Sequence, residues 1–191
     1  MELNTYPLVC TRGVVLYPNQ EIVIDVGRDT SVHAVENAQD NYDKKICLFS
    51  QKELEQENPG KEDIYSVGTL CEVRHIRRFD NFLRVKFRGI KRVKLNNWIN
   101  GSLSDLAEVE ILESEKQDAV EEEALIRMIA DELDRMQGQD RFVTKEIVME
   151  ISKGMGGEFL SDKAVQGLPL DIERKQQYLE TLGVNDRLMM L

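Results

Sequence analysis

Residues 82–88 read FLRVKFR, and this short run decides how the sequence around it is interpreted. Leu, Val and Phe alternate here with Arg, Lys and Arg. A period of two indicates a β-strand with one apolar face and one basic face. Gly89 permits a turn into a further apolar run at 90–95, and Asp80-Asn81 offers a turn after the run at 73–79. This part of the chain therefore predicts an antiparallel meander.

The sequence before this meander also predicts strands, because β-branched and aromatic runs alternate with turn residues. One helix interrupts them over residues 32–38, with Ser31 as its N-cap. Residues 53–63 contain Asn-Pro-Gly and predict a solvated loop. The additional strands are expected at 13–17, 21–26 and 45–49.

Charge divides the chain into two parts. Residues 1–105 hold 15 basic and 15 acidic side chains, whereas residues 106–191 hold 10 basic and 20 acidic ones, so the second part carries the whole net charge of −10. Nine of the twelve aromatic residues fall in the first part, and six of the seven Met residues fall in the second. This contrast predicts two domains, a β-rich one at 1–113 and a helical one at 114–191.

The second part predicts helices, because apolar residues recur at spacings of three and four between Val120 and Leu133. Ser114 to Gln117 has the form of a capping box before this helix. A second apolar stripe contains Ile147, Val148, Ile151 and Met155, and Leu168-Pro169-Leu170 separates a short helix from one that starts near Asp171. A last helix starting at Asn185 or Asp186 is still apolar at Leu191. We therefore expect the chain to be truncated before a further module.

Motifs for catalysis, metal binding and membrane insertion are missing from the sequence. It has no Gly-x-x-x-x-Gly-Lys-Ser/Thr loop, no Gly-x-Ser-x-Gly elbow and no Cys-x-x-Cys pair, and it has only two His residues. No run reaches the 18 or so apolar residues of a spanning helix, and residues 1–6 lack a signal-peptide pattern. We expect a soluble, untargeted protein with no catalytic residue, no metal site and no bound cofactor.

The segment from Arg74 to Lys94 contains nine cations and one acid, Asp80, together with three Phe residues. Such a cluster can bind a nucleic-acid backbone while aromatic rings stack on the bases. The period of two favours a different interpretation, in which the cations form a solvated outer face or a dock for the acidic helices. Nucleic acid is therefore not the expected partner.

A second candidate surface is apolar. Large apolar side chains are expected at a strand end and beside the Asp80-Asn81 turn, where loops should be solvated. Clustered exposed apolar groups usually mark a surface for a partner or a peptide. The alternative is that these side chains close the end of a barrel. The candidate residues are Tyr17, Pro18, Ile76, Phe79 and Phe82.

Short motifs along nearly the whole chain resemble the N-terminal region of Lon, the ATP-dependent protease. The order and spacing of these motifs are more specific than any one of them. Gly13, Cys10, Cys71 and the order Ala164-Val165 depart from the family pattern. The matching motifs are Pro7-Leu8, Arg12, 14–18, 26–28, Ser31, 34–36, 51–52, 63–69, Val85, Gly89, Arg92, 160–162, 168–170, 175–180 and 187–188.

The resemblance implies an α+β protein, with an N-terminal PUA-like twisted antiparallel β pseudo-barrel and a short helix, followed by a C-terminal helical bundle. It implies a cytoplasmic, non-catalytic region that binds unfolded, damaged or degron-bearing proteins and helps to organise a homohexamer. The ATPase, with ATP and Mg²⁺, and the Ser-Lys peptidase of the parent protease would follow Leu191. The alternatives are a free-standing adaptor of the same fold and, less favoured, a PUA-like RNA binder.

Overall fold

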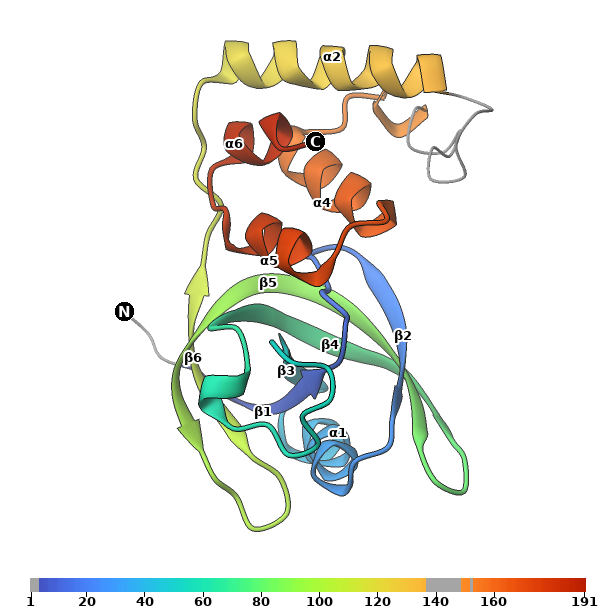
Figure 1. Ribbon diagram of the computed structural model, residues 1–191, viewed down its shortest axis with the longest axis vertical. Coiled ribbons are helices and arrows are strands. Elements are labelled where there is room, and N and C mark those ends of the chain that lie inside the picture. The colour runs from blue at the N-terminus through green and yellow to red at the C-terminus, as the bar shows by residue number, and fades with distance from the viewer. Residues whose placement is uncertain (1–3, 137–148, 152) are drawn as a thin grey trace. The chain divides into compact units, whose positions relative to one another are not determined.

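The computed structural model describes residues 4–136, 149–151 and 153–191 (Figure 1). The chain divides into two compact units, Met1–Leu112 and Glu113–Leu191. The first contains a six-stranded sheet and one α-helix, and the second is helical. The predicted α+β class is confirmed.

The first unit is built on a sheet with strand order β2-β5-β4-β3-β1-β6, and a further pairing of β5 with β6 closes five of these strands into a ring. β1 and β3 are parallel, so the sheet is mixed and the expectation of a wholly antiparallel barrel is wrong for this pair. A parallel pair needs a long crossover, which β2 and α1 provide. The elements are β1 (Asn4–Thr11), β2 (Glu21–Val26), α1 (Asp29–Asn41), β3 (Lys45–Ser50), the short 3₁₀ helix η1 (Lys61–Asp63), β4 (Val67–Arg78), β5 (Leu83–Ile99) and β6 (Leu106–Leu112).

The FLRVKFR run begins β5 and has the predicted faces. Leu83, Val85 and Phe87 are buried, whereas Arg84 and Arg88 are exposed. This first half of β5 pairs with β2 and β4, and the second half pairs with β4 and β6. One 17-residue strand therefore belongs to both halves of the sheet.

Gly89 lies inside β5, so the turn predicted there is wrong. Its amide donates to the carbonyl oxygen of Gln20, and its own carbonyl oxygen accepts from the amide of Asn19, both at 2.9 Å. A Cβ at this position would lie 2.1 Å from the carbonyl oxygen of Tyr17. Glycine is needed here because another segment of backbone crosses the strand.

That crossing segment, residues 13–17, is not the strand that its sequence predicts. Its carbonyl groups accept hydrogen bonds from side-chain hydroxyls instead of from a neighbouring strand. Thr11 and Ser50 both donate to the carbonyl oxygen of Val14, at 2.7 and 2.6 Å, and Thr69 donates to that of Leu16 at 2.5 Å. The segment is thereby fixed against the sheet without extending it.

Two apolar clusters form the core of the first unit, and β3 contributes to both. Ile46 and Leu48 belong to the cluster that also contains the buried face of α1, whereas Cys47 and Phe49 belong to the cluster that contains residues of β6. α1 begins at Asp29 with Arg28 as its N-cap, so Ser31 is not the cap that was expected. Ser31 is buried within the first helical turn instead.

The second unit contains α2 (Ala119–Met136), α4 (Gly157–Gly167), α5 (Ile172–Glu180) and α6 (Val184–Met189). Asp118 caps α2, because its carboxylate accepts from the amides of Val120 and Glu121 at 2.8 and 2.9 Å. The expected capping box at Ser114 is therefore wrong. Of the second apolar stripe, residues 147 and 148 lie outside the described part of the chain, and Ile151 and Met155 pack in the core of this unit.

A buried arginine organises the end of the second unit. The guanidinium of Arg187 donates to the carbonyl oxygens of Thr181 and Leu182, at 2.9 and 3.2 Å, and lies 3.9 Å from the carboxylate of Asp162. Arg187 and Asp162 are both almost wholly inaccessible to solvent. A buried charge of this kind is tolerated only when it is paired and hydrogen-bonded.

We predict that Gly89→Ala lowers the free energy of unfolding of the first unit by about 2–3 kcal/mol, because the added methyl group collides with the backbone at Tyr17. Gly60→Ala is the matched control, since the nearest atom to its new Cβ is 3.7 Å away. Denaturant titration of both variants measures the difference. Equal stability of the two variants would contradict the close approach at Gly89.

Candidate functional site

The hairpin between β4 and β5 carries two of the apolar residues predicted from the sequence. The amide of Phe79 donates to the carbonyl oxygen of Phe82 at 2.9 Å and closes the turn at Asp80-Asn81. The two rings stack with their centroids 4.6 Å apart and an interplanar angle of 11°. Both side chains remain partly exposed. The β4–β5 hairpin itself projects from the first unit in Figure 1.

Two arginines cover these rings. The guanidinium carbon of Arg77 lies 5.1 Å from the centroid of Phe79, and that of Arg84 lies 5.3 Å from Phe79 and 5.7 Å from Phe82. Cation–π contacts at these distances are favourable, and they hold the arginine side chains against the two rings. We call Arg77, Phe79, Phe82 and Arg84 the hairpin surface.

The other three predicted residues do not join the hairpin surface. Tyr17 is completely buried and Pro18 is also buried, because their segment crosses β5 at Gly89. The expectation that Tyr17 and Pro18 are exposed is therefore wrong. Ile76 is partly buried and packs against the core cluster that contains α1. These residues fill the interior of the first unit.

Acidic partners neutralise much of the basic segment between residues 74 and 94. Arg84 forms two hydrogen bonds to Asp25 at 2.7 and 2.8 Å, and Lys86 lies 2.6 Å from Glu21 on the same neighbouring strand. Hydrogen bonds from these cations lower the pKa of both carboxyl groups. Arg74 and Arg78 also have acidic partners, and Arg92 is buried. These pairs favour the interpretation of this segment as a solvated outer face.

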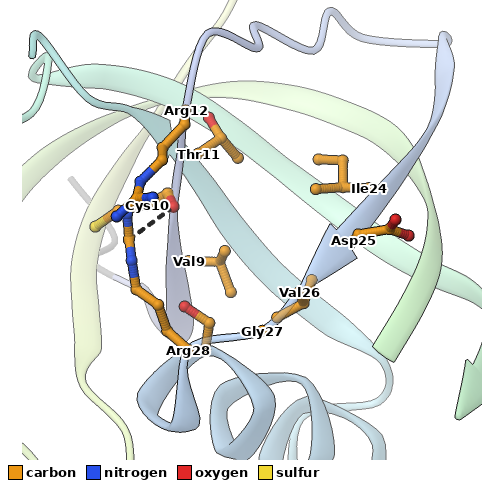
Figure 2. Close-up of a pocket in the computed structure, with 10 residues that line it drawn as sticks. Val9, Cys10, Thr11, Arg12, Ile24, Asp25, Val26, Gly27 and Arg28 are labelled. Atoms are coloured by element: carbon orange, nitrogen blue, oxygen red, sulfur yellow. Dashed lines mark hydrogen bonds between the residues drawn. The ribbon is translucent and has the colours of Figure 1, made fainter. Parts of the chain in front are cut away.

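A cleft of about 360 Å³ lies between the end of β1 and the end of β2 (Figure 2). Val9, Ile24 and Val26 form its apolar side. Arg12 and Arg28 extend toward each other along the opposite face of β1, where Cys10 points (Figure 2). The apolar residues and the two arginines therefore lie on opposite faces of β1.

Hydrogen bonds hold Arg28 in place. One guanidinium nitrogen donates to the carbonyl oxygen of Cys10 at 3.3 Å, and another donates to the side-chain oxygen of Gln51. Gln51 is completely buried and in turn donates to the carbonyl oxygens of Glu53 and Gln56. Arg12 donates to the same carbonyl of Gln56 at 3.4 Å. One network thus ties both arginines to the loop after β3.

Burial and the nearby charge of Arg12 lower the pKa of Arg28 from its usual high value, while Arg28 remains a cation at neutral pH. Burial also raises the pKa of the Cys10 thiol to about 12. Cys10 is therefore a neutral thiol at physiological pH and is a poor nucleophile. Cys10 therefore contributes packing against the core cluster that contains residues of β6.

Sequence reasoning did not assign a site to Arg12 and Arg28. Both belong to the motifs quoted for the family resemblance, and they are the only basic residues before position 44. Arg12 directly follows β1, and Arg28 follows β2 after one intervening residue, Gly27. Two isolated cations in an otherwise uncharged or acidic stretch are a weak signal that could have drawn attention to them.

Within residues 4–136, 149–151 and 153–191, no group of three or more His, Cys, Asp or Glu side chains is arranged to hold a metal ion. In the same ranges, no helix has both the length and the apolar character needed to cross a membrane.

The fold defines a Lon N-terminal domain. Its arrangement is similar to that of the N-terminal domain of the Mycobacterium avium complex Lon protease, with a TM-score of 0.77 at 19% identity over 97% of this chain and 95% of that one. A Lon N-terminal domain protein from Xanthomonas campestris gives a TM-score of 0.68 at 15% identity, with the same coverage.

The chain belongs to the family of ATP-dependent protease La (LON) substrate-binding domains, whose sequence model matches residues 5–191. It is 33% identical over 194 residues to the Lon protease of Syntrophomonas wolfei and 31% identical over 186 residues to that of Buchnera aphidicola from Schizaphis graminum. These alignments cover 100% and 97% of this chain. The chain spans about a quarter of the length of these relatives, 24% in both cases.

We predict that Arg84→Gln raises the pKa of Asp25 toward its ordinary value of 3.8, because the hydrogen bonds from Arg84 hold that pKa down. Because the pKa of Asp25 is lower in the folded protein than in the unfolded chain, its carboxylate stabilises the fold when the pH is above the ordinary pKa. This stabilisation is lost as the pH falls through the folded-state pKa. The stability difference between wild type and variant should therefore be present at neutral pH and vanish in acid.

An NMR titration of the Asp25 carboxyl carbon measures its pKa. Denaturant titrations at neutral pH and in acid measure the stability difference between wild type and variant. Arg88→Gln removes the same charge from the exposed face of β5 and should leave the pKa of Asp25 low. An unchanged Asp25 pKa in Arg84→Gln would show that this pair does not hold the carboxylate in its charged form.

Proposed function

We propose that this chain is the non-catalytic region of a Lon protease that captures unfolded, damaged or degron-bearing proteins for degradation. The match to the LON substrate-binding domain over residues 5–191 is the observation that carries this proposal. ATP, Mg²⁺ and peptide hydrolysis belong, in this proposal, to other modules of a cytoplasmic parent protease. This region delivers polypeptide to those modules.

The hairpin surface is the proposed contact for unfolded polypeptide. Unfolded chains differ from folded ones by exposing apolar and aromatic side chains, so an exposed pair of rings distinguishes the two without reading a sequence. The stacked rings of Phe79 and Phe82 are partly exposed, and Val23 on the adjacent outer face is 56% exposed. Arg77 and Arg84 keep the rings fixed, which reduces the entropy that binding must overcome.

Binding by one copy is expected to be weak, because a small surface must offset the loss of freedom of a flexible peptide. We propose that the region acts in a homohexamer, where six copies present the surface to one polypeptide. Rebinding at a neighbouring copy then raises the apparent affinity through effective concentration. The hairpin surface can therefore bind polypeptides of many different sequences and still retain a bound polypeptide.

We predict that Phe79→Ser combined with Phe82→Ser weakens the binding of a permanently unfolded polypeptide by about fivefold or more, because it removes most of the apolar area of the hairpin surface. Fluorescence anisotropy of one labelled polypeptide, in a folded and a permanently unfolded form, measures this at two salt concentrations. Binding should be confined to the unfolded form and should survive added salt.

Leu103→Ser is the matched control, since Leu103 is an exposed apolar residue of the first unit outside the hairpin surface. It should bind as wild type does. Unchanged binding by a folded Phe79, Phe82 double variant would remove the hairpin surface from the proposal. Binding to labelled RNA that collapses with salt, without binding to the unfolded polypeptide, would overturn the proposed function.

A further inference from the structure

Arg77 differs from the other arginines of the β4–β5 hairpin in its partners. Arg74, Arg78 and Arg84 each form an ion pair with an acidic side chain. Arg77 is exposed, and in the part of the chain that the structure describes it forms no ion pair. It contacts the ring of Phe79 instead, with its guanidinium carbon 5.1 Å from the ring centroid. A guanidinium group has five N–H donors, so those of Arg77 are available to a ligand.

The side chains around Arg77 on the outer face of the hairpin are basic or aromatic. Side chains on a strand alternate between its faces, so His75 and Phe79 are the neighbours of Arg77 along β4. The register places Arg84 directly opposite Arg77, and Lys86 opposite His75. Like charges directly opposite each other destabilise a sheet. The fold alone therefore does not explain two arginines at this pair of positions.

The nearest acidic side chains do not compensate this charge. Asp25 accepts two hydrogen bonds from Arg84, and Glu21 lies 2.6 Å from Lys86. Both acids belong to β2, which β5 separates from β4, and two strand spacings amount to about 9–10 Å. Asp80 in the turn is exposed and forms no ion pair within the described residues. Arg77 therefore retains its charge for a partner outside the chain.

The position of Arg77 also leaves room for such a partner. β4 pairs with β3 only over residues 69–72. Over residues 74–78, β4 has β5 on one edge and no described strand on the other. A polypeptide can therefore approach Arg77 without displacing a strand of the sheet.

The stacked rings restrain Arg77 and add an apolar contact beside it. The cation–π interaction with Phe79 uses none of the N–H groups as hydrogen-bond donors, so a carboxylate can still be bound by two of them. Less side-chain freedom is lost on binding because the guanidinium is already held against the ring. Phe79 and Phe82 stack at 4.6 Å, so the apolar contact and the cation lie together.

We propose that the hairpin surface selects unfolded segments in which an acidic residue lies two positions from an aromatic or large apolar residue. The apolar side chain contacts Phe79 and Phe82, and the carboxylate accepts hydrogen bonds from Arg77. Residues two apart lie on the same face of an extended chain, as Arg77 and Phe79 do along β4. This inference rests on the proposed capture of unfolded polypeptide and adds a charge preference to it.

The test uses three unstructured fluorescent peptides with the same two Phe residues, each Phe having Glu, Gln or Lys two positions away. Anisotropy titrations with the whole chain should show the Glu peptide binding about three- to fivefold more tightly than the Gln peptide, since the ion pair is exposed. The Lys peptide should bind more weakly than the Gln peptide. Added salt should bring the ratio between Glu and Gln peptides toward one and change the affinity of the Gln peptide little.

Arg77→Gln should reduce the ratio between Glu and Gln peptides to near one. If Arg77 only restrained the rings, its replacement would weaken all three peptides alike, so the ratio reports the carboxylate contact itself. Arg77→Lys keeps the charge without the planar pair of donors and should give an intermediate ratio. Arg88→Gln is the matched control, because it removes the same charge from the exposed outer face of β5, and it should keep the wild-type ratio.

Equal binding of the Glu and Gln peptides by wild type would overturn this inference and leave the proposed function standing. A wild-type ratio in Arg77→Gln would overturn it as well, because another cation would then bind the carboxylate. Failure of wild type to bind any of the three peptides would also overturn it. The titration with the long unfolded polypeptide would then decide the proposed function by itself.

Discussion

The first unit depends on one strand that is shared between two parts of the sheet. β5 forms hydrogen bonds with β2 and β4 along its first half and with β4 and β6 along its second half, and its pairing with β6 closes the ring. A strand of 17 residues can do this only if it bends. Register shifts at Leu70/Cys71, Val73/His75 and Leu95/Asn97 provide the bending, as bulges do in other closed sheets.

The bend in β5 also explains why the segment before β2 is buried. Gly89 is near the middle of β5, and the absence of a side chain there lets the backbone at Tyr17 lie directly on the strand. The crossing fixes the start of β2, since the backbones of Asn19 and Gln20, immediately before that strand, are hydrogen-bonded to the backbone of Gly89. β2 therefore remains at the edge of the sheet, where it borders the cleft.

Features set by neighbours in the sequence could be predicted, and features set by distant neighbours could not. The alternation in residues 82–88 and the helical stripe from Val120 to Leu133 are local, and both elements exist as predicted. Gly89 resembles a turn residue in sequence, and only the crossing of a segment some 70 residues earlier explains it. The same crossing buries Tyr17 and Pro18, whereas Phe79 and Phe82 flank a two-residue turn and remain partly exposed.

The second unit shows the same limit for a polar residue. Its apolar periodicity indicates where helices lie, and the break at Leu168–Leu170 separates α4 from α5 as predicted. Periodicity does not indicate that the guanidinium of Arg187 is buried beside Asp162, because that depends also on the hydroxyl groups of Ser161 and Ser114, which are far away in the sequence. Replacing either charge alone would leave the other buried without the opposite charge beside it, which is a large energetic cost.

The distribution of partners, more than the number of cations, decides where the first unit can attract an anion. The sequence places nine cations between Arg74 and Lys94, but acids on β2, α1 and β4 neutralise four of them, and aromatic rings hold Arg77 and Arg84. Arg12 and Arg28 are only two cations, but the oxygen atoms that accept their hydrogen bonds are neutral. In the described part of the chain, these hydrogen bonds orient the two arginines without an ion pair. Arg12 is exposed and Arg28 is partly buried, so solvent still screens the charge of both side chains. The number of cations in a stretch of sequence therefore does not indicate their free charge, because the acidic partners of a cation come from other strands and helices.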